Sequence, residues 1–338
     1  MPAMSTVSED QRNCILKKLK SQNLSYIRHE VRDLACFERL FSQETRDFKN
    51  YLAWDIRDFE SAKGCALQSR EILKSVLMRG DLAVACALAI PLNGFVYIYS
   101  LNILEEYAGQ GLLEDMLFIF LWDIISKTGC IIEGQPFLFN CPLDVSRLEP
   151  FEHVLLEKVF MVCDTSKAVI HSQQDKAIMA LNINLPLEFL AGFITESYAQ
   201  HPESNVSSFY RSRGDACFYL NDLLNNQGCG PYLPGASCIA FGDGKVLGFD
   251  IITSTGEGRG HLAQIAVKKG FRKKGIGGFL LRNSINWLKE NGYTTVSLSV
   301  AKKLFTHEWY SSIGFRDVLD FTGFRILGPK GSQQSEKT

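Results

Sequence analysis

The sequence lacks a charge excess of either sign. Its 338 residues contain 36 Lys plus Arg against 37 Asp plus Glu, which leaves a formal net charge of -1 at pH 7. Without a basic surplus, the chain has no general electrostatic attraction to nucleic acid or to an anionic membrane surface. We therefore expect no nucleic-acid partner and no membrane partner, and any bound anion has to be held by a local site.

Metal-binding and export signals are also missing. The ten cysteines include no C-x-x-C pair and no neighbouring histidine cluster, so we expect no metal site and no disulfide framework. The N-terminal segment has no apolar core of a secretory signal. The most apolar run, residues 116–125, is much shorter than the roughly 20 residues that span a bilayer, and it predicts a buried helix. These features favour a cytoplasmic location with free thiols.

What the chain does have is enough apolar sequence for a large folded core. Hydrophobic residues make up 46% of the chain and charged residues 22%, which is typical of globular proteins. The length favours two domains. A polar stretch after residue 164 suggests a boundary, so we predict domains at residues 1–168 and 169–330, followed by a disordered tail at 331–338.

The second half follows a regular order of elements. Helical spacing at 187–194 and 218–224 predicts two helices, and β-rich runs at 237–241 and 246–252 flank an Asp-Gly step that favours a tight hairpin. A third strand at 261–267 then leads through a glycine-rich loop into an apolar helix that ends near Asn291. A strand at 295–300, a short helix into Tyr310 and a Gly314-Phe315 turn complete the order.

The glycine-rich loop, residues 271–278, is the strongest chemical feature. Three glycines stand at the entrance of a helix, directly after Arg272, Lys273 and Lys274. Glycines allow backbone N–H groups to face a ligand, and a helix N-terminus favours an anion such as a pyrophosphate. An ordinary strand-to-helix turn with a solvated basic surface is the alternative. A dinucleotide-binding loop would need glycine where Arg272 stands, and a P-loop would need a G-K-[ST] sequence.

Two segments together resemble the GNAT family of N-acetyltransferases. Residues 267–281 are similar to the family's acetyl-CoA signature, in which Arg272, Gly275 and Gly277 fill the three defining positions. Tyr310, four residues before Gly314-Phe315, is similar to the later signature. The resemblance implies an α+β fold with a mixed, mostly antiparallel central sheet flanked by helices.

The resemblance also implies a reaction. Acetyl-CoA would be the co-substrate, and the acceptor would be an amine of a small molecule, a peptide or a protein. The loop would bind the CoA pyrophosphate and the third strand would pair with pantetheine, through Ile265, Ala266, Val267, Arg272, Lys273, Lys274, Gly275, Ile276, Gly277 and Gly278. Many members have Asn and Ala where this chain has Lys303 and Thr306, so the contact of that Asn with pantetheine is not carried over.

The implied general acid is Tyr310, which would protonate the leaving thiolate. The family often uses a strand carboxylate or an ordered water as base, but the third strand carries His261 and Gln264. His261 and Asp250 are the tentative bases. The alternatives are that His261 is a surface imidazole at a strand end, that Asp250 faces solvent, and that Tyr310 is only a core aromatic residue.

The sequence of the first half predicts the same order of elements without the chemical residues. A strand at 94–100, a glycine turn at 107–113 and a helix at 114–126 precede a predicted strand at 137–140 and a closing segment at 155–161. Aligning the glycine turns puts Ala108 at Arg272, Gly111 at Gly275 and Leu113 at Gly277. Aligning the closing segments puts Leu156 at Tyr310 and Phe160 at Gly314. We therefore predict a degenerate, non-catalytic GNAT-like domain in a tandem arrangement.

Other functions are consistent with the same residues. A non-catalytic acyl-CoA-binding or scaffolding module fits the absence of a strand carboxylate. Transfer of another acyl group, or of an aminoacyl group from tRNA, is a further alternative, although a tRNA donor would not require the pyrophosphate loop. The sequence does not identify the acceptor or the oligomeric state.

Overall fold

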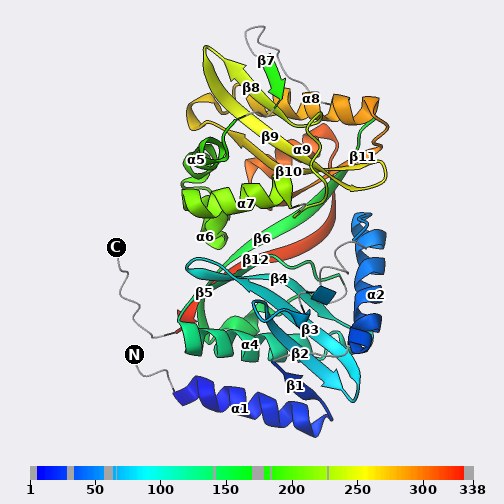
Figure 1. The fold of residues 1–338 in the computed structure, drawn as a ribbon, viewed down its shortest axis with the longest axis vertical. Helices are drawn as coiled ribbons and strands as arrows, with labels where there is room; N and C mark the ends of the chain where they lie inside the picture. The colour runs from blue at the N-terminus through cyan, green and yellow to red at the C-terminus, as the bar shows by residue number, and fades with distance from the viewer. Residues whose placement is uncertain are drawn as a thin grey trace. The chain divides into compact units, whose positions relative to one another are not determined.

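The computed structural model of the chain describes residues 6–28, 34–56, 64–65, 67–139, 142–169, 179–182, 185–226 and 228–330. These residues form two compact units (Figure 1). Unit 1 comprises Met1–Phe48, Ile56–Leu156 and Phe321–Thr338, and unit 2 comprises Lys49–Asp55 and Glu157–Asp320. This division differs from the predicted one at residue 168, because each unit takes in a piece of chain from the other half. The predicted tail, 331–338, lies outside the described residues.

Unit 1 is a mostly antiparallel sheet with strand order β1-β2-β3-β4-β5-β12, in which only β4 and β5 run parallel. Its strands are β1 (Ser25–Ile27), β2 (Leu73–Arg79), β3 (Leu82–Pro91), β4 (Phe95–Ile103), β5 (Ile131–Gly134) and the second part of β12 (Arg316–Pro329). Its helices are α1 (Thr6–Ser21), α2 (Glu38–Asp47) and α4 (Leu112–Thr128), with short turns η1 (Leu34–Phe37), η3 (Glu105–Tyr107) and η4 (Val145–Leu148).

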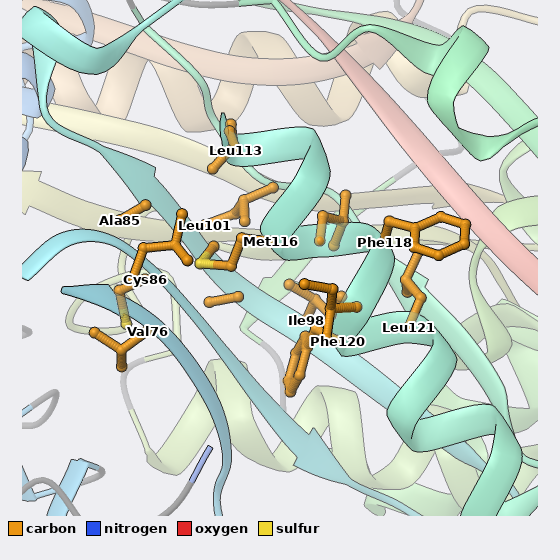
Figure 2. Packing of buried hydrophobic residues seen from close by; sticks show 14 of the residues in the cluster. Val76, Ala85, Cys86, Ile98, Leu101, Leu113, Met116, Phe118, Phe120 and Leu121 are labelled. Atoms are coloured by element: carbon orange, nitrogen blue, oxygen red, sulfur yellow. The ribbon is translucent and has the colours of Figure 1, made fainter. Parts of the chain in front are cut away.

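The core of unit 1 forms around α4, the helix predicted from the apolar run at 116–125. Every residue of that run is buried, and Met116 and Phe120 lie against strand residues such as Ile98 (Figure 2). Asp123 is buried within the run, and its carboxylate is paired with Arg12 and Arg28, each at 2.9 Å. A buried charge is tolerated when it is paired in this way. The prediction of a buried helix is thus confirmed.

Unit 2 has the strand order β6-β11-β10-β9-β8-β7, and again one neighbouring pair, β10 with β11, is parallel. Its strands are the second part of β6 (Phe151–Asp164), β7 (Met179–Asn182), β8 (Cys238–Gly242), β9 (Lys245–Gly256), β10 (Arg259–Val267), β11 (Thr295–Ala301) and the start of β12. Its helices are α5 (Leu187–Tyr198), α6 (Glu203–Val206), α7 (Arg213–Asn225), α8 (Ile276–Glu290) and α9 (Phe305–Ile313), with turns η2 (Phe48–Leu52), η5 (Ser208–Tyr210) and η6 (Lys269–Phe271).

The predicted elements of the second half are present in the predicted order. The hairpin between β8 and β9 turns at Asp243 and Gly244, which both have positive φ (50° and 69°), as a type I′ turn requires. Helices α5 and α7 pack on one face of the sheet against Phe249, Ile251 and Ala266. Helices α8 and α9 pack on the other face. The fold is therefore α+β with a mixed, mostly antiparallel sheet, as predicted.

The first half deviates from its predicted pattern after α4. The strand that follows α4 is β5, not residues 137–140; Phe137 and Phe139 lie outside the strands, and Asn140 is outside the described residues. Phe137 packs against Phe48 and Phe321, with ring centroids 5.9 and 4.8 Å apart, so its apolar character reflects core packing. The closing segment is strand β6, so the alignment of Leu156 with Tyr310 and of Phe160 with Gly314 is wrong.

Strands β6 and β12 each belong to both units. The first part of β6 lies in unit 1, and residues 158–164 pair with β11 in unit 2. Conversely, β12 starts in unit 2, and Phe324, Arg325 and Ile326 pair with β5 in unit 1. Each unit's sheet is thus completed by a strand that begins in the other unit. No helix among the described residues is long and apolar enough to cross a membrane.

The shared strand predicts that the second half cannot be cut out at residue 169. A fragment of residues 169–330 lacks β6, which leaves one side of β11 unpaired and removes the buried Val159, Met161 and Cys163 from the core. Fully burying each such side chain contributes about 1.5–3 kcal/mol. We expect this fragment to aggregate, and a fragment of residues 151–330 to be more soluble, in size-exclusion chromatography and thermal melts. Equal melting of the two fragments would contradict the role of β6.

Candidate active site

Strands β10 and β11 separate partway along their length. Their parallel pairing covers Arg259 to Leu262 on β10 and ends there. Beyond this point β11 continues to pair with β6, through Ser299, Val300 and Ala301, while β10 continues to pair with β9. The second part of β10 therefore has an edge that pairs with no strand among the described residues, and this edge leads directly into the glycine loop.

The free edge of β10 presents N–H donors. Lys268 donates its N–H to Leu247 of β9, and alternate residues of an antiparallel strand face the same neighbour, so Ile265 and Val267 face away from β9. The carbonyl of Ile265 accepts from the Tyr198 hydroxyl at 3.1 Å, and that of Val267 accepts from Arg272 Nε at 3.1 Å. The two N–H groups remain for a ligand. Ala266, also predicted as a binding residue, differs because its backbone faces β9.

The glycine loop ends in a helix start with uncovered N–H groups. Gly275 caps α8 in the left-handed region (φ 82°), without a side-chain cap. The first backbone bond of α8 runs from the Phe279 N–H to the Gly275 carbonyl. For the N–H groups of residues 273–278 there is no backbone acceptor among the described residues. Lys273, Lys274 and Gly275 are exposed, Gly277 is half-buried, and Ile276 and Gly278 are buried.

The three cations of the loop have different roles. Arg272 donates to the carbonyls of Val267 and Ser197, so its guanidinium ties the loop to β10 and α5. The ammonium groups of Lys273 and Lys274 lie over the rings of Phe305 and Phe271, 5.7 and 5.2 Å from the centroids. Neither ammonium has a carboxylate partner within the described part of the chain. Two cations are therefore available beside the helix start.

Tyr310 lies on α9, on the same face of the sheet as α8. It is 5% exposed and packs between Trp309 and Phe315, with ring centroids 4.8 and 5.5 Å away. Burial is the main cause that raises its pKa above the usual value, followed by the charges of Tyr198 and Asp250. The phenol therefore stays protonated at neutral pH. Its hydroxyl has no hydrogen-bond partner among the described residues, unlike a structural tyrosine with a satisfied hydroxyl.

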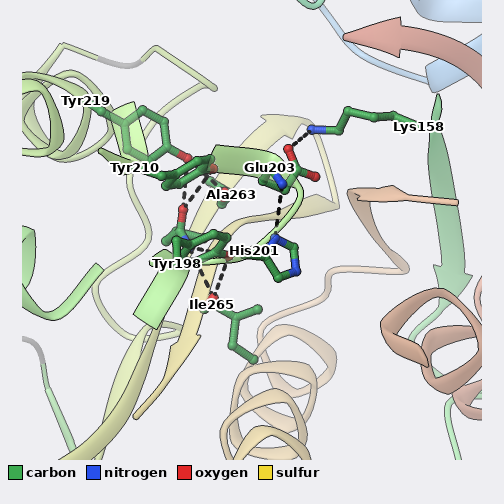
Figure 3. A network of polar contacts seen from close by, with 9 residues as sticks. Lys158, Tyr198, His201, Glu203, Tyr210, Tyr219, Ala263 and Ile265 are labelled. Carbon is green, nitrogen blue, oxygen red and sulfur yellow. Dashed lines mark hydrogen bonds and ion pairs between the residues drawn. The ribbon is translucent and has the colours of Figure 1, made fainter. Parts of the chain in front are cut away.

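Three tyrosines that Figure 3 shows together, Tyr198, Tyr210 and Tyr219, form hydrogen bonds with the Gln264 side chain. The Gln264 amide donates to the Tyr198 hydroxyl at 2.9 Å and accepts from Tyr219 and Tyr210 at 3.2 and 3.4 Å. Tyr219 also donates to the carbonyl of Ala263, at 3.2 Å. Ala263 is an extra residue in β10, a bulge between the pairs made by Leu262 and Gln264. The bulge turns Gln264 to the face that carries Tyr198, and no pattern in the sequence predicts this bulge.

A buried ion pair lies beside this tyrosine cluster. Lys158 of β6 and Glu203 of α6 are 2.8 Å apart, with side chains 7% and 9% exposed (Figure 3). The backbone N–H of Glu203 donates to His201 Nδ1, and the His201 ring lies 5.1 Å from that of Tyr198. Burial lowers the pKa of His201, so the imidazole is neutral at neutral pH. The carboxylate of Glu203 is occupied by Lys158 and not free to hold a second cation.

Asp250 is not solvent-facing, and that interpretation is wrong. Its side chain is fully buried on the α8 face, where it accepts from the Cys238 N–H at 2.9 Å and from the Ser284 hydroxyl. Burial raises its pKa from 3.8 to about 6, against the lowering effect of these bonds. The carboxyl is therefore a core group, on the face opposite to Gln264.

His261 is not a surface imidazole either. It is 5% exposed, its Nδ1 lies 3.0 Å from the Ser297 hydroxyl, and its ring packs against those of Trp54 and Phe160, at 5.0 and 5.9 Å. Burial lowers its pKa to about 3. Trp54 comes from Lys49–Asp55, the early segment that belongs to unit 2 and whose Ala53 carbonyl accepts from Arg259. Because Trp54 and His261 are far apart in the sequence, no local pattern predicts this contact.

Unit 1 has a turn at the start of α4 that resembles the glycine loop of unit 2, but side chains of unit 1 occupy the groups around it. Gly111 caps α4 in the left-handed region (φ 73°) after turn η3, as Gly275 caps α8 after η6, which supports the predicted alignment of the two glycines. The first turn of α4 carries buried Glu114 and Asp115, and Lys18 pairs with Asp115 at 2.6 Å. On β4, Gln43 of α2 donates to the Ile103 carbonyl and accepts from the Glu105 N–H.

The Lys158–Glu203 pair predicts a large loss of stability when one charge is removed. Lys158→Met leaves Glu203 buried without its ammonium partner, which we expect to lower the free energy of unfolding by about 3–5 kcal/mol. In Lys158→Met/Glu203→Leu most of this loss is regained. Lys302→Met, which removes a more exposed partner of Asp320, is the control, with an expected effect of about 0–1 kcal/mol. Denaturant unfolding measures all three; equal effects of the two lysine variants would contradict burial of the pair.

The raised pKa of Asp250 predicts a specific pH dependence. Because the folded pKa (about 6) exceeds the ordinary 3.8, the folded state binds the proton more tightly. The carboxyl's contribution is fully present below about pH 4 and is lost as pH rises through about 6. Relative to Asp250→Asn, the native protein should gain about 2–3 kcal/mol between pH 7 and pH 4. Asp243→Asn at the hairpin turn is the control in urea unfolding; a difference that stays constant with pH would refute the shift.

Comparison with known proteins places this geometry in a family. Residues 199–315 match the family model described as the acetyltransferase (GNAT) family. Curated protein sequences give no match. The matched segment contains β10, the glycine loop, α8 and Tyr310. Among the described residues, no group of three or more His, Cys, Asp and Glu side chains could hold a metal ion.

Solved structures resemble the chain over most of its length. A GCN5-related N-acetyltransferase from Sphaerobacter thermophilus superposes with a TM-score of 0.62 and 16% identity, covering 90% of this chain and 96% of that one. A tandem GNAT protein from the clavulanic acid biosynthesis pathway gives a TM-score of 0.56 and 11% identity, covering 90% and 99%. Residues 199–315 are therefore a domain of the GNAT acetyltransferase family, and the chain as a whole has the fold of a tandem GNAT protein.

Proposed function

We propose that unit 2 is an acyl-CoA-dependent N-acyltransferase that transfers an acetyl group from acetyl-CoA to an amine. The observation that carries this proposal is the separation of β10 from β11 beyond Leu262, beside a loop of uncovered N–H groups. A thioester needs hydrogen-bond donors for its carbonyl, and a diphosphate needs donors and positive charge. Both sets of donors lie along one continuous stretch of chain, residues 265–278.

The diphosphate binds at the start of α8. The N–H groups of residues 273–278 and the dipole of a 15-residue helix favour an anion there. Lys273 and Lys274 add two positive charges at the rim. Arg272 acts indirectly, because its bonds to the Val267 and Ser197 carbonyls hold the loop against β10 and α5.

The pantetheine arm and the thioester lie along the free edge of β10. Since the carbonyls of Ile265 and Val267 already accept hydrogen bonds, this edge offers donors to a ligand that is rich in carbonyl groups. The N–H of Ile265, next to the bulge, is the donor we assign to the developing oxyanion. A pre-aimed donor of this kind lowers a reaction barrier by about 3 kcal/mol. The hydrogen bonds around Gln264 fix the bulge that aims it.

The chemical step is direct attack by the amine. Its nitrogen forms a bond to the carbonyl carbon, the carbon–sulfur bond breaks, and Tyr310 donates a proton to the departing thiolate. The raised pKa keeps the phenol protonated until that thiolate forms beside it. The amine loses one proton, which balances the one gained by the sulfur.

Neither tentative base is retained in this mechanism. His261, with a pKa of about 3, is a weak proton acceptor at neutral pH, and its ring packs against Trp54 and Phe160. Asp250 bonds to Ser284 on the α8 face. We infer that the amine loses its proton to water, on the side of β10 where Tyr198 and Gln264 lie. The acceptor is an amine of a small molecule, a peptide or a protein.

Unit 1 has no acyltransferase activity of its own in this proposal. The carboxylates of Glu114 and Asp115 in the first turn of α4 repel a diphosphate, and Leu113 fills the place of Gly277. Gln43 occupies the backbone groups at the end of β4. Unit 1 therefore contributes structure, through its part of β6 and β12.

Two substitutions test the assigned roles through acetyl-CoA consumption with a panel of amines. Tyr310→Phe removes the acid, so kcat should fall about 10²–10⁴-fold at an unchanged Kd for CoA. Gly277→Glu places a carboxylate at the helix start, where φ is ordinary and a Cβ has room 3.6 Å from Trp309, so CoA binding should be lost. Gly214→Glu, at an exposed glycine of α7, is the control for added charge.

Three outcomes separate the alternatives. Full activity of both variants would reject the site. CoA binding without turnover of any amine would favour a binding or scaffolding module. Faster turnover with a longer acyl-CoA than with acetyl-CoA would indicate that the transferred group is the longer acyl group.

A further inference from the structure

Thr306 carries a buried hydroxyl group in the first turn of α9. The side chain is half-buried, and its Oγ1 is buried without a hydrogen-bond partner among the described residues. Ser311 in the same helix shows the usual arrangement, because its hydroxyl donates to the carbonyl of His307, four residues earlier. A buried polar atom without such a partner is rare in folded proteins and calls for an explanation.

The Thr306 side chain lies on the same face of α9 as Tyr310. Thr306, Tyr310 and Ile313 follow the i, i+4, i+7 spacing of one helical face, and the last two are buried in the core of unit 2. The exposed residues of the helix, such as Glu308 and Ser311, lie on other faces. A long helical side chain leans back towards the helix N-terminus, over the residue four positions earlier. The phenol of Tyr310 therefore points towards Thr306.

Two other polar groups act on the Tyr310 phenol, and each is hydrogen-bonded elsewhere. The charges of Tyr198 and Asp250 both contribute to its raised pKa. The Tyr198 hydroxyl donates to the carbonyl of Ile265 on β10. The carboxylate of Asp250 accepts from the Ser284 hydroxyl. Neither group is placed to exchange a proton with the phenol, so the hydroxyl one turn earlier on α9 is the remaining candidate.

The proposed reaction takes a proton from a residue that burial keeps protonated. When Tyr310 gives its proton to the departing thiolate, a phenolate is left in a position that is only 5% exposed. Burial disfavours the charged form, so this phenolate has to regain a proton before the next turnover. Water is the source of that proton. A hydroxyl group near the start of a helix is suited to pass it on, because it both donates and accepts hydrogen bonds.

We propose that Thr306 returns the proton to Tyr310 in each turnover. The inference rests on the proposed function, in which Tyr310 is the acid. The two hydroxyl groups are not bonded to each other, so the path includes one bridging water. This water gives a proton to the phenolate oxygen and takes one from the Thr306 hydroxyl, which takes one from solvent. The amine releases one proton to water in the same turnover, so the protons balance.

Double-mutant kinetics test whether Thr306 acts through Tyr310. Thr306→Val removes the hydroxyl at nearly constant shape, so kcat should fall about tenfold, as for one lost hydrogen bond to a charged group, at an unchanged KM for acetyl-CoA. In Tyr310→Phe, which has no phenol to recharge, the same substitution should have no further effect. Thr306→Ser should retain the native kcat. Thr195→Val, which removes a helical hydroxyl from α5, is the matched control and should leave kcat unchanged.

The possible outcomes separate this role from others. An equal fall of kcat in both backgrounds, or a raised KM for acetyl-CoA, means that Thr306 acts on the donor or on the fold, and overturns the inference. An unchanged kcat in Thr306→Val overturns it as well. In each of these cases turnover by the native protein retains the proposed function. A native protein that consumes no acetyl-CoA with any amine would reject the proposed function and the inference together.

Discussion

The separation of β10 from β11 is the constraint on which the rest of the site depends. Two parallel strands that stay paired would bury their backbone groups in the ladder between them. Here the pairing ends at Leu262, because β11 continues along β6 while β10 continues along β9. The released edge keeps only N–H donors, since Tyr198 and Arg272 occupy its carbonyls. The separation of the two strands thus exposes a row of backbone N–H donors, which favours ligands with many hydrogen-bond acceptors.

Most polar groups around this opening are neutral and hydrogen-bonded, or belong to an ion pair. Gln264 stands where a carboxylate would be expected for a base, and three tyrosine hydroxyls satisfy its amide. Lys158 neutralises Glu203 nearby. Such a fully bonded cluster is rigid, because each member that moves leaves a buried group unsatisfied. Rigidity is what a bulged backbone needs if its N–H is to point in one direction.

Much of the second half could be predicted from the sequence, because local patterns dominate there. The glycine loop, the Asp-Gly hairpin and the alternation of β11 are short-range signals, and β8 to α9 lie at the predicted positions. The burial of Asp250 and His261 could not be read in this way. The partner of Asp250 is Ser284, far along the chain, and His261 packs against Trp54, which comes from the other half. The bulge at Ala263 also reverses the face of Gln264 relative to simple alternation.

The first half shows the opposite balance. The helix of unit 1 and its capping glycine follow from the apolar run and the turn before it. The prediction of a strand at Phe137 was wrong, because long-range packing with Phe48 and Phe321 accounts for the aromatic residues there. The local sequence pattern does not predict that β6 and β12 each start in one unit and pair in the other. An apolar strand has the same pattern whichever sheet it joins.

That exchange has a consequence for how the chain is made. A ribosome releases the chain from its N-terminus, and domains of most proteins fold as they emerge. Unit 1 has to wait, since β5 pairs with Phe324, Arg325 and Ile326, which are synthesised long after β5 itself. Until the second part of β12 has been synthesised, β5 therefore lacks the neighbour that it has in the folded protein.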